Sequence, residues 1–129
     1  MSVMDVVAGM LTAAGVADVY TVAPARRVCA QPVVVEPAEW ELVAEGKHAG
    51  RWIAKVRVHV ASETAAAGYD RARVCEDALN SGDWSGFGRV DVEVLAVRAG
   101  MPSFVGTDSG GYFVWAVEAR LTCETDSPR

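Results

Sequence analysis

Ser109 lies in the segment Asp108-Ser109-Gly110-Gly111, the part of the sequence that most suggests catalytic chemistry. A serine nucleophile needs a histidine that takes its proton, a carboxylate that orients the histidine, and an oxyanion hole. The chain contains two histidines, His48 and His59, so the residue types for such a site are present. Their sequence context decides whether hydrolysis is a sensible expectation.

The Ser109 segment resembles the nucleophile segment of chymotrypsin-like serine proteases, whose two-barrel scaffold is far longer than this chain. Thr107 stands where that family has Gly, and Lys47-His48-Ala49-Gly50 differs from the family's Ala-Ala-His-Cys. Asp and Gly residues also form tight turns. We therefore predict that this segment shapes the turn before the last strand and that the protein is not an enzyme. A small hydrolase that uses Ser109 is the weakest alternative.

The histidines do not form a metal-ligand motif. His48 is predicted on a loop and His59 on the polar face of a strand, where Glu63 could approach it. Isolated histidines in such positions are typical of a solvated surface rather than of a metal centre. The glycines of residues 82–88 precede a strand instead of a lysine and a helix, so they do not form a phosphate-binding loop. We expect no metal and no cofactor.

The three cysteines, Cys29, Cys75 and Cys123, are an odd number without Cys-x-x-Cys spacing. This pattern favours reduced thiols that pack as small hydrophobic residues, and a reducing cytosol as the compartment. The longest apolar runs are shorter than the roughly 20 residues that cross a bilayer. Residues 1–10 carry Asp5 and no Lys or Arg, so neither a membrane span nor a secretory signal is expected.

The composition predicts a sheet rather than a helical bundle. The 129 residues include 22 Val and 21 Ala but only five Leu and one Ile. Branched Val packs well on a pleated surface and loses rotamer freedom in a helix. The net charge of −5 supplies no excess of positive charge for a phosphate backbone, which argues against sequence-specific nucleic-acid binding.

The first 37 residues are predicted to hold one helix and two short strands. Ser2 and Asp5 form a capping signal for a helix with one apolar face, which ends at Gly15. Short strands are expected at 18–22 and 33–35, bracketed by three prolines that cannot donate ladder hydrogen bonds. This region is therefore predicted to be an edge strand or an extended arm.

Longer segments carry clearer periodicity. Alternation of apolar and polar residues predicts strands at 51–61, 89–98 and 112–123. Residues 40–44 are expected to form a hairpin with 51–61, and 65–79 is predicted to be a helix capped by Ser62 or Thr64.

The predicted fold class is α+β, with two helices packed on one face of a mostly antiparallel or mixed sheet. Residues 1–123 are predicted to form a single domain and 124–129 a flexible tail. If strands 51–61 and 89–98 are neighbours, Lys55 and Arg57 would pair with Asp91 and Glu93 on the exposed face.

Large apolar residues in predicted loops are the remaining unusual feature. They are either a lid on the core or an interface with a neighbouring molecule. An extended arm with Arg26 and Arg27 is also easier to explain in an assembly than in a monomer. We therefore predict interface residues, from loop apolarity and from the arm, at Trp84, Phe87, Met101, Phe104, Val105, Arg26 and Arg27.

The order of these features resembles the tail terminator or tail completion proteins, also described as minor capsid or neck proteins, of long-tailed bacteriophages. The matching features are a short N-terminal helix ending at Gly15, the strand 55–60 running directly into the helix 65–79, and Gly106-x-Asp108-x-x-Gly111-Tyr112 before the long final strand. Together they span most of the chain.

The resemblance implies a virion structural protein of the tail or neck, assembled in the host cytoplasm. Such a protein forms a homo-oligomeric ring, typically of six copies, that caps the tail tube protein and joins it to the head-tail connector proteins. Genomic DNA passes through its lumen without sequence-specific binding, and no membrane is involved. Two alternatives stay open: a head-closure or connector neck protein, and a small-ligand-binding α+β domain whose aromatic loops cover a pocket.

Overall fold

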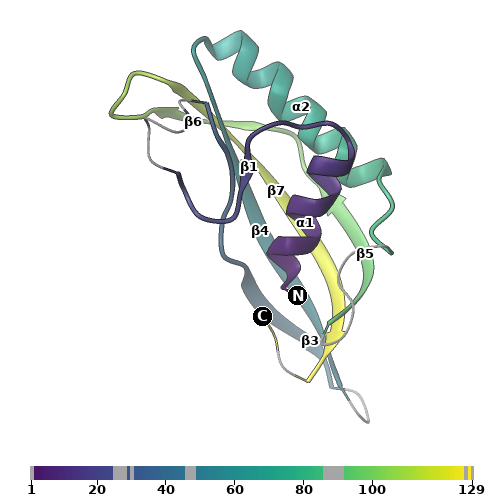
Figure 1. Ribbon diagram of the computed structural model, residues 1–129. Coiled ribbons are helices and arrows are strands. Elements are labelled where there is room, and N and C mark those ends of the chain that lie inside the picture. The colour runs from purple at the N-terminus through teal and green to yellow at the C-terminus, as the bar shows by residue number, and fades with distance from the viewer. Residues whose placement is uncertain are drawn as a thin grey trace.

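The computed structural model describes residues 2–24, 29, 31–45, 49–85, 92–126 and 128. Two helices and seven strands follow one another along the chain (Figure 1). They are α1 (Val3–Ala13), β1 (Val19–Tyr20), β2 (Val33–Val35), β3 (Glu39–Ala44), β4 (Gly50–Ser62), α2 (Ala65–Ser81), β5 (Glu93–Ala99), β6 (Ser103–Thr107) and β7 (Phe113–Thr125). None of the helices within these residues is long and apolar enough to cross a membrane.

The sheet is built around one long antiparallel pair. Strands β4 and β7 have 13 residues each and pair along their whole length, from Gly50↔Thr125 to Ser62↔Phe113. Each has two short strands on its other side: β2 and β3 pair with β4, whereas β5 and β6 pair with β7. Strand β1 adds to β2 in parallel, so the sheet is mixed and mostly antiparallel. This confirms the predicted fold class.

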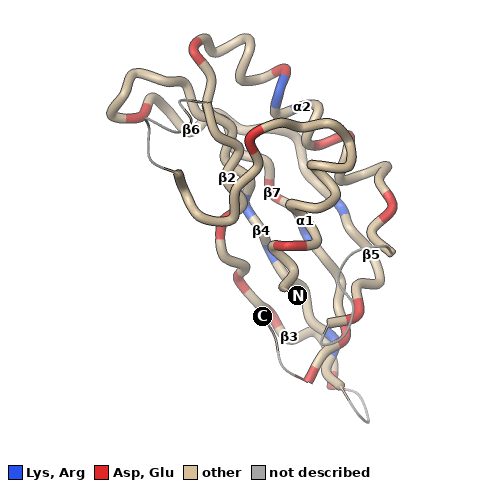
Figure 2. The backbone as a smooth tube through the Cα atoms, viewed as in Figure 1, with Lys and Arg blue, Asp and Glu red and all other residues tan. Residues whose placement is uncertain are grey.

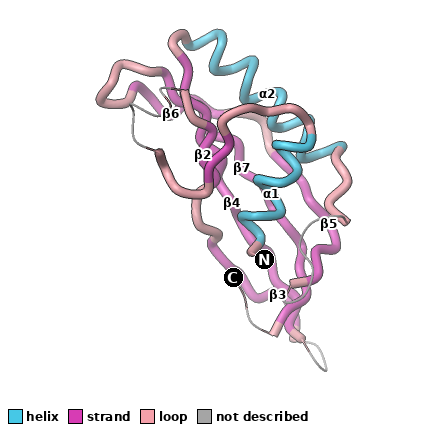
Figure 3. The backbone as a smooth tube through the Cα atoms, in the orientation of Figure 1, coloured by secondary structure: helices cyan, strands magenta, loops and turns pink. Residues whose placement is uncertain are grey.

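Both helices lie on the same face of the sheet (Figures 1 and 3). In α1 the predicted capping box is confirmed, because the amide of Ser2 donates to Asp5 Oδ2 at 3.0 Å and the amide of Asp5 donates to Ser2 Oγ at 3.3 Å. Gly15 follows the helix with a φ of +90°, a conformation that favours glycine. Thr64 caps α2 by accepting from the amide of Ala67 at 3.1 Å.

The core fills the space between this face and the helices. Alternate residues of β4 and β7 point into it and are fully buried, as the alternation predicts: Ala54, Val56, Val58, Val60, Val117, Ala119, Leu121 and Cys123. Helix α2 covers them with small residues such as Ala72 and Cys75, which allow the helix to lie close to the sheet. The Val and Ala excess of the sequence is therefore largely used in one core.

The opposite face of the sheet carries charged residues, as predicted, but their partners differ. Lys55 and Arg57 lie opposite Arg120 and Glu118 of β7, because β7 and not β5 is the neighbour of β4. The expected pairing with β5 is therefore wrong. Asp91, the other expected partner, lies outside the described residues.

Several predicted boundaries also change. The first strand covers only Val19–Tyr20 of the expected 18–22. Strand β7 continues to Thr125, which is buried, so the last strand includes the first two residues of the predicted tail. Strand β5 begins at Glu93, and residues 86–91 before it lie outside the described part of the chain. Strand β6 was expected to be a loop.

Candidate interaction site at the sheet edges

Phe104 of β6 is anchored in an aromatic cluster. Its ring contacts Trp115 of β7 with centroids 5.3 Å apart and Phe113 at 6.3 Å, and Tyr69 of α2 contacts the same Trp115 at 5.1 Å. The indole Nε1 of Trp115 donates to the carbonyl of Ala65 at 3.0 Å, which fixes the ring at the start of α2. Phe104 nevertheless remains 51% exposed, so half of its ring is available to a neighbouring molecule.

Met101 and Val105 extend this apolar surface. Met101 lies in the turn between β5 and β6, and Val105 is the extra residue of a β-bulge between Phe104 and Gly106. A bulge residue has no direct partner in the ladder. Met101 and Val105 are 66% and 51% exposed. Val105 therefore lies on an edge strand rather than in the predicted loop, whereas Met101 lies in a turn as predicted, and their role in an interface stays a prediction.

Trp84 has a different environment from Phe104. It is half-buried, packs against the core, and donates its indole N–H to the carbonyl of Val94 at 3.0 Å. With Asn80 and residues 96–99 it lines a cavity of about 490 Å³. These contacts favour a lid on the core over an interface with a neighbouring molecule. Phe87, Arg26 and Arg27 lie outside the described residues.

Strand β3 is a second exposed apolar edge, and none of its residues is among the predicted interface residues. Leu42 and Val43 are 43% and 56% exposed, and among the described strands β3 pairs with β4 alone. Val43 is the extra residue of another bulge, between Leu42 and Ala44. The sequence indicates this edge only through the adjacent apolar residues Leu42 and Val43, which break the alternation that begins at Glu39.

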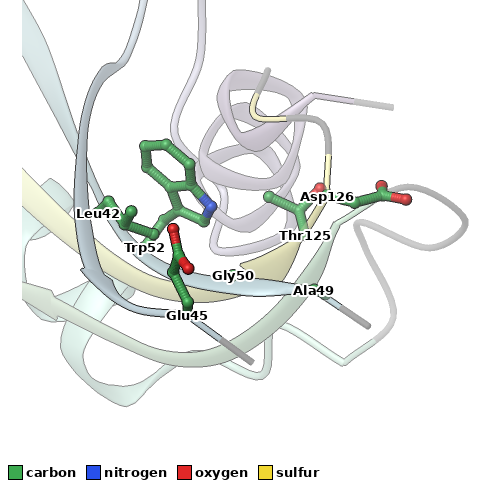
Figure 4. Close-up of a pocket in the computed structure, with 7 residues that line it drawn as sticks. All are labelled: Leu42, Glu45, Ala49, Gly50, Trp52, Thr125 and Asp126. Carbon is green, nitrogen blue, oxygen red and sulfur yellow. The ribbon is translucent and has the colours of Figure 1, made fainter. Parts of the chain in front are cut away.

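A pocket of about 250 Å³ lies beside Leu42, where the β3–β4 hairpin meets the end of β7 (Figure 4). Its lining includes the indole ring of Trp52 and the carboxylates of Glu45 and Asp126. A Cβ on Gly50 would lie 2.8 Å from Trp52 Nε1, so glycine at this position leaves room for the ring. The carboxylate of Glu45 lies near the Trp52 ring, whereas that of Asp126 points away from it (Figure 4). An aromatic ring beside a carboxylate suits a basic side chain.

His59 pairs with Glu36, a partner that the sequence did not indicate. Its Nδ1 lies 3.1 Å from Glu36 Oε1. Glu36 directly follows β2, which pairs with the part of β4 that contains His59. The two residues line a pocket of about 290 Å³ together with Cys29 and Asp108. Within the described ranges, no group of three or more His, Cys, Asp or Glu side chains is arranged to hold a metal ion. His48 is not among the described residues.

The Ser109 segment is the turn of the β6–β7 hairpin, as predicted. Asp108 Oδ1 accepts from the amides of Gly110 at 2.9 Å and Tyr112 at 3.0 Å, and the amide of Asp108 donates to the carbonyl of Tyr112. Gly111 has a φ of +82°, which the turn requires. The carboxylate therefore organises the turn, and Ser109 is exposed at its tip.

The cysteines are free thiols, and two of them behave as core residues. Burial raises the pKa of Cys75 to about 11 and that of Cys123 to about 12, because a thiolate is poorly solvated in the core. Both thiols are therefore protonated and unreactive at neutral pH. Cys29 is half-buried.

The fold has a solved counterpart in a virus-like particle. A chain from a structure described as the virion of a native gene transfer agent particle superposes with a TM-score of 0.69, covering 88% of this chain and 84% of that chain. The two sequences are 16% identical, so the likeness establishes a shared fold. No protein-family model and no curated protein matches the sequence.

Proposed function

We propose that this protein is a structural, non-enzymatic component of a phage-like virion, and that it acts as a tail terminator. Six copies form a ring that caps the tail tube and joins it to the head-tail connector. The observation that carries this proposal is the fold shared with a gene transfer agent virion chain over most of both chains. The same class of protein follows from the sequence resemblance to tail terminators.

The surface of the molecule supports an assembly role. Exposed apolar residues lie on strands at both sides of the sheet, with Leu42 and Val43 on β3 and Phe104 and Val105 on β6. Different surfaces on opposite sides of one chain suit heterologous contacts, which close into a ring when the rotation per subunit permits. A ring of chains that each carry a net charge of −5 repels DNA phosphates, which suits passage of DNA through the lumen without binding.

Immunogold labelling of particles from the organism that encodes this chain tests the role. The proposal predicts gold at the junction between head and tail, and tails without heads when the gene is deleted. Particles that lack the chain contradict a virion role. Labelling that stays with isolated heads after the tails are removed contradicts the terminator role and indicates a head-closure or connector protein instead.

A ligand-binding function is the second candidate, because Trp84 and Asn80 line a cavity of about 490 Å³. Asn80 already uses its side chain on the backbone of Ala99, donating to its carbonyl at 3.0 Å and accepting from its amide at 2.8 Å. Binding of a small molecule there predicts a raised melting temperature in a screen of metabolites, with the protein monomeric throughout.

A further inference from the structure

We propose that copies of this chain associate head to tail, with the outer side of β3 of one copy against the outer side of β5 of the next. The inference rests on the assembly proposed above and names the two surfaces that make it. We call these surfaces the β3 edge and the β5 edge. They lie on opposite sides of the central β4–β7 pair and at the same end of it.

The charges on the two edges are complementary and occupy the same row of the sheet. The backbone register places Glu39 of β3 opposite Lys55, Lys55 opposite Arg120, and Arg120 opposite Arg98 of β5. This row begins with a carboxylate at one edge and ends with a guanidinium at the other. A neighbouring copy whose β3 edge lies against the β5 edge at the same level therefore brings its Glu39 beside Arg98.

The two ends of this row differ within one chain, because Glu39 lies opposite Lys55 whereas Arg98 lies opposite Arg120. Glu39 and Arg98 are both exposed, and no ion pair involves either of them among the described residues. Arg98 instead lies opposite Arg120, and like charges on directly opposed residues of a sheet are unfavourable. Arg120 already pairs with Glu118 at 3.3 Å, and an acidic neighbour would supply Arg98 with a partner of the same kind. The acidic residues of β3 can be followed in Figure 2.

The exposed apolar residues of the two edges are level as well. The register places Leu42 of β3 in the same row as Val94 of β5, and each strand has a bulge residue beside this row. These bulge residues, Val43 and Leu95, are 56% and 36% exposed. Contact between the two edges buries apolar area on both, which favours association.

The bulges also decide the kind of contact. A bulge disrupts the regular ladder and twists an edge, which disfavours continuous strand addition. On β5, Trp84 and Asn80 also already hydrogen-bond to the backbone of Val94 and Ala99, so these groups are not available to a neighbouring strand. Side chains therefore make most of the contact. Two identical β3 edges would bring Glu39, Glu41 and Glu45 of both copies together, so the head-to-tail arrangement is favoured over a symmetric one.

Charge exchange tests the pairing by sedimentation of the full chain. Glu39→Arg and Arg98→Glu are each expected to weaken self-association about tenfold or more, and the double variant is expected to restore it, because the exchanged charges meet again. Asp70→Arg, at an exposed position of α2, is the matched control and should leave association unchanged. Melting temperatures close to that of the parent verify folding. A double variant as weak as the two single variants overturns the pairing.

A mixing experiment tests the head-to-tail geometry. Val43→Lys blocks the β3 edge and Leu95→Lys blocks the β5 edge, so each variant alone should be monomeric. An equimolar mixture should form dimers and nothing larger, because one intact edge remains on each partner. Self-association of either variant alone, or a mixture that stays monomeric while the parent associates, overturns the arrangement. If the parent itself is monomeric at its highest soluble concentration, this contact is wrong, whereas the particle labelling described above still decides the virion role.

Discussion

The central β4–β7 pair and the edge strands contain the same kinds of apolar residue, but in different environments. Val58 and Val117 face each other in the central pair and are completely buried, whereas Val43 and Val105 are bulge residues on edge strands and are more than half exposed. The difference lies in pairing and cover: Val58 lies between Val35 of β2 and Val117 of β7, and the helices cover this face of the sheet. The comparison indicates that apolar residues of the centre stabilise the fold and that those of the edges are available for association.

The largest effect is expected from Leu121→Ala in the central pair. Removing a fully buried leucine side chain leaves a cavity and lowers the free energy of unfolding by about 2–5 kcal/mol. The matched edge variant, Leu42→Ala, should cost less than about 1 kcal/mol, since Leu42 is 43% exposed. Urea unfolding measures both free energies, and equal losses would contradict the difference between central and edge residues.

Trp84→Ala comes next, with a loss of about 2–3 kcal/mol, because this half-buried ring packs on the core and its indole N–H is bonded to Val94. Phe104→Ala is expected to cost about 1 kcal/mol, mainly from its contacts with Trp115 and Phe113. Thermal unfolding compares the two variants. A greater loss for Phe104→Ala would show that Phe104 at the β6 edge stabilises the fold more than Trp84 does.

Arg71→Met tests how the edge strand β2 is held, because Arg71 links the segment before β2 to the central strand β4. Its Nη1 donates to the carbonyls of Gln31 at 3.2 Å and Ala61 at 2.7 Å. Losing this donor should cost about 1–3 kcal/mol. Arg57→Met on the exposed face is the control and should stay within about 0.5 kcal/mol. Faster amide exchange in β2 than in β4 would show that the edge detaches first.

The last prediction concerns the buried thiols, whose ionisation has no effect on stability at neutral pH. Folding raises the pKa of Cys75 and Cys123, so the unfolded state loses these protons first as the pH rises. Stability should therefore decline between about pH 9 and pH 12, and Cys75→Ala should reduce this decline. At pH 8 a thiol reagent should modify Cys29 well before the other two. Rapid modification of all three in the native protein would contradict the core placement.

Features governed by local periodicity could be predicted from the sequence. The capping box of Ser2 and Asp5, the Thr64 cap and the alternation of β4 depend on residues close together in the chain. The Asp108 turn belongs to the same group, because its hydrogen bonds span at most four residues.

Features governed by strand order or by bulges could not be predicted in this way. The partners of Lys55 and Arg57 depend on β7 lying between β4 and β5, and His59 meets Glu36 only because β2 returns along β4. Strand β6 is short, follows Pro102, and has its alternation broken by the bulge at Val105, so its apolar residues resembled a loop. The β3 edge was missed because its exposure depends on which side of the sheet is left open.

The native mass of the unmodified protein, measured by mass spectrometry at increasing concentration with negative-stain images of the same samples, tests the central claim most directly. If the edges serve assembly, the mass should rise to that of six copies and the images should show closed rings. A protein that remains monomeric at every concentration, with the edges still exposed, would contradict the account.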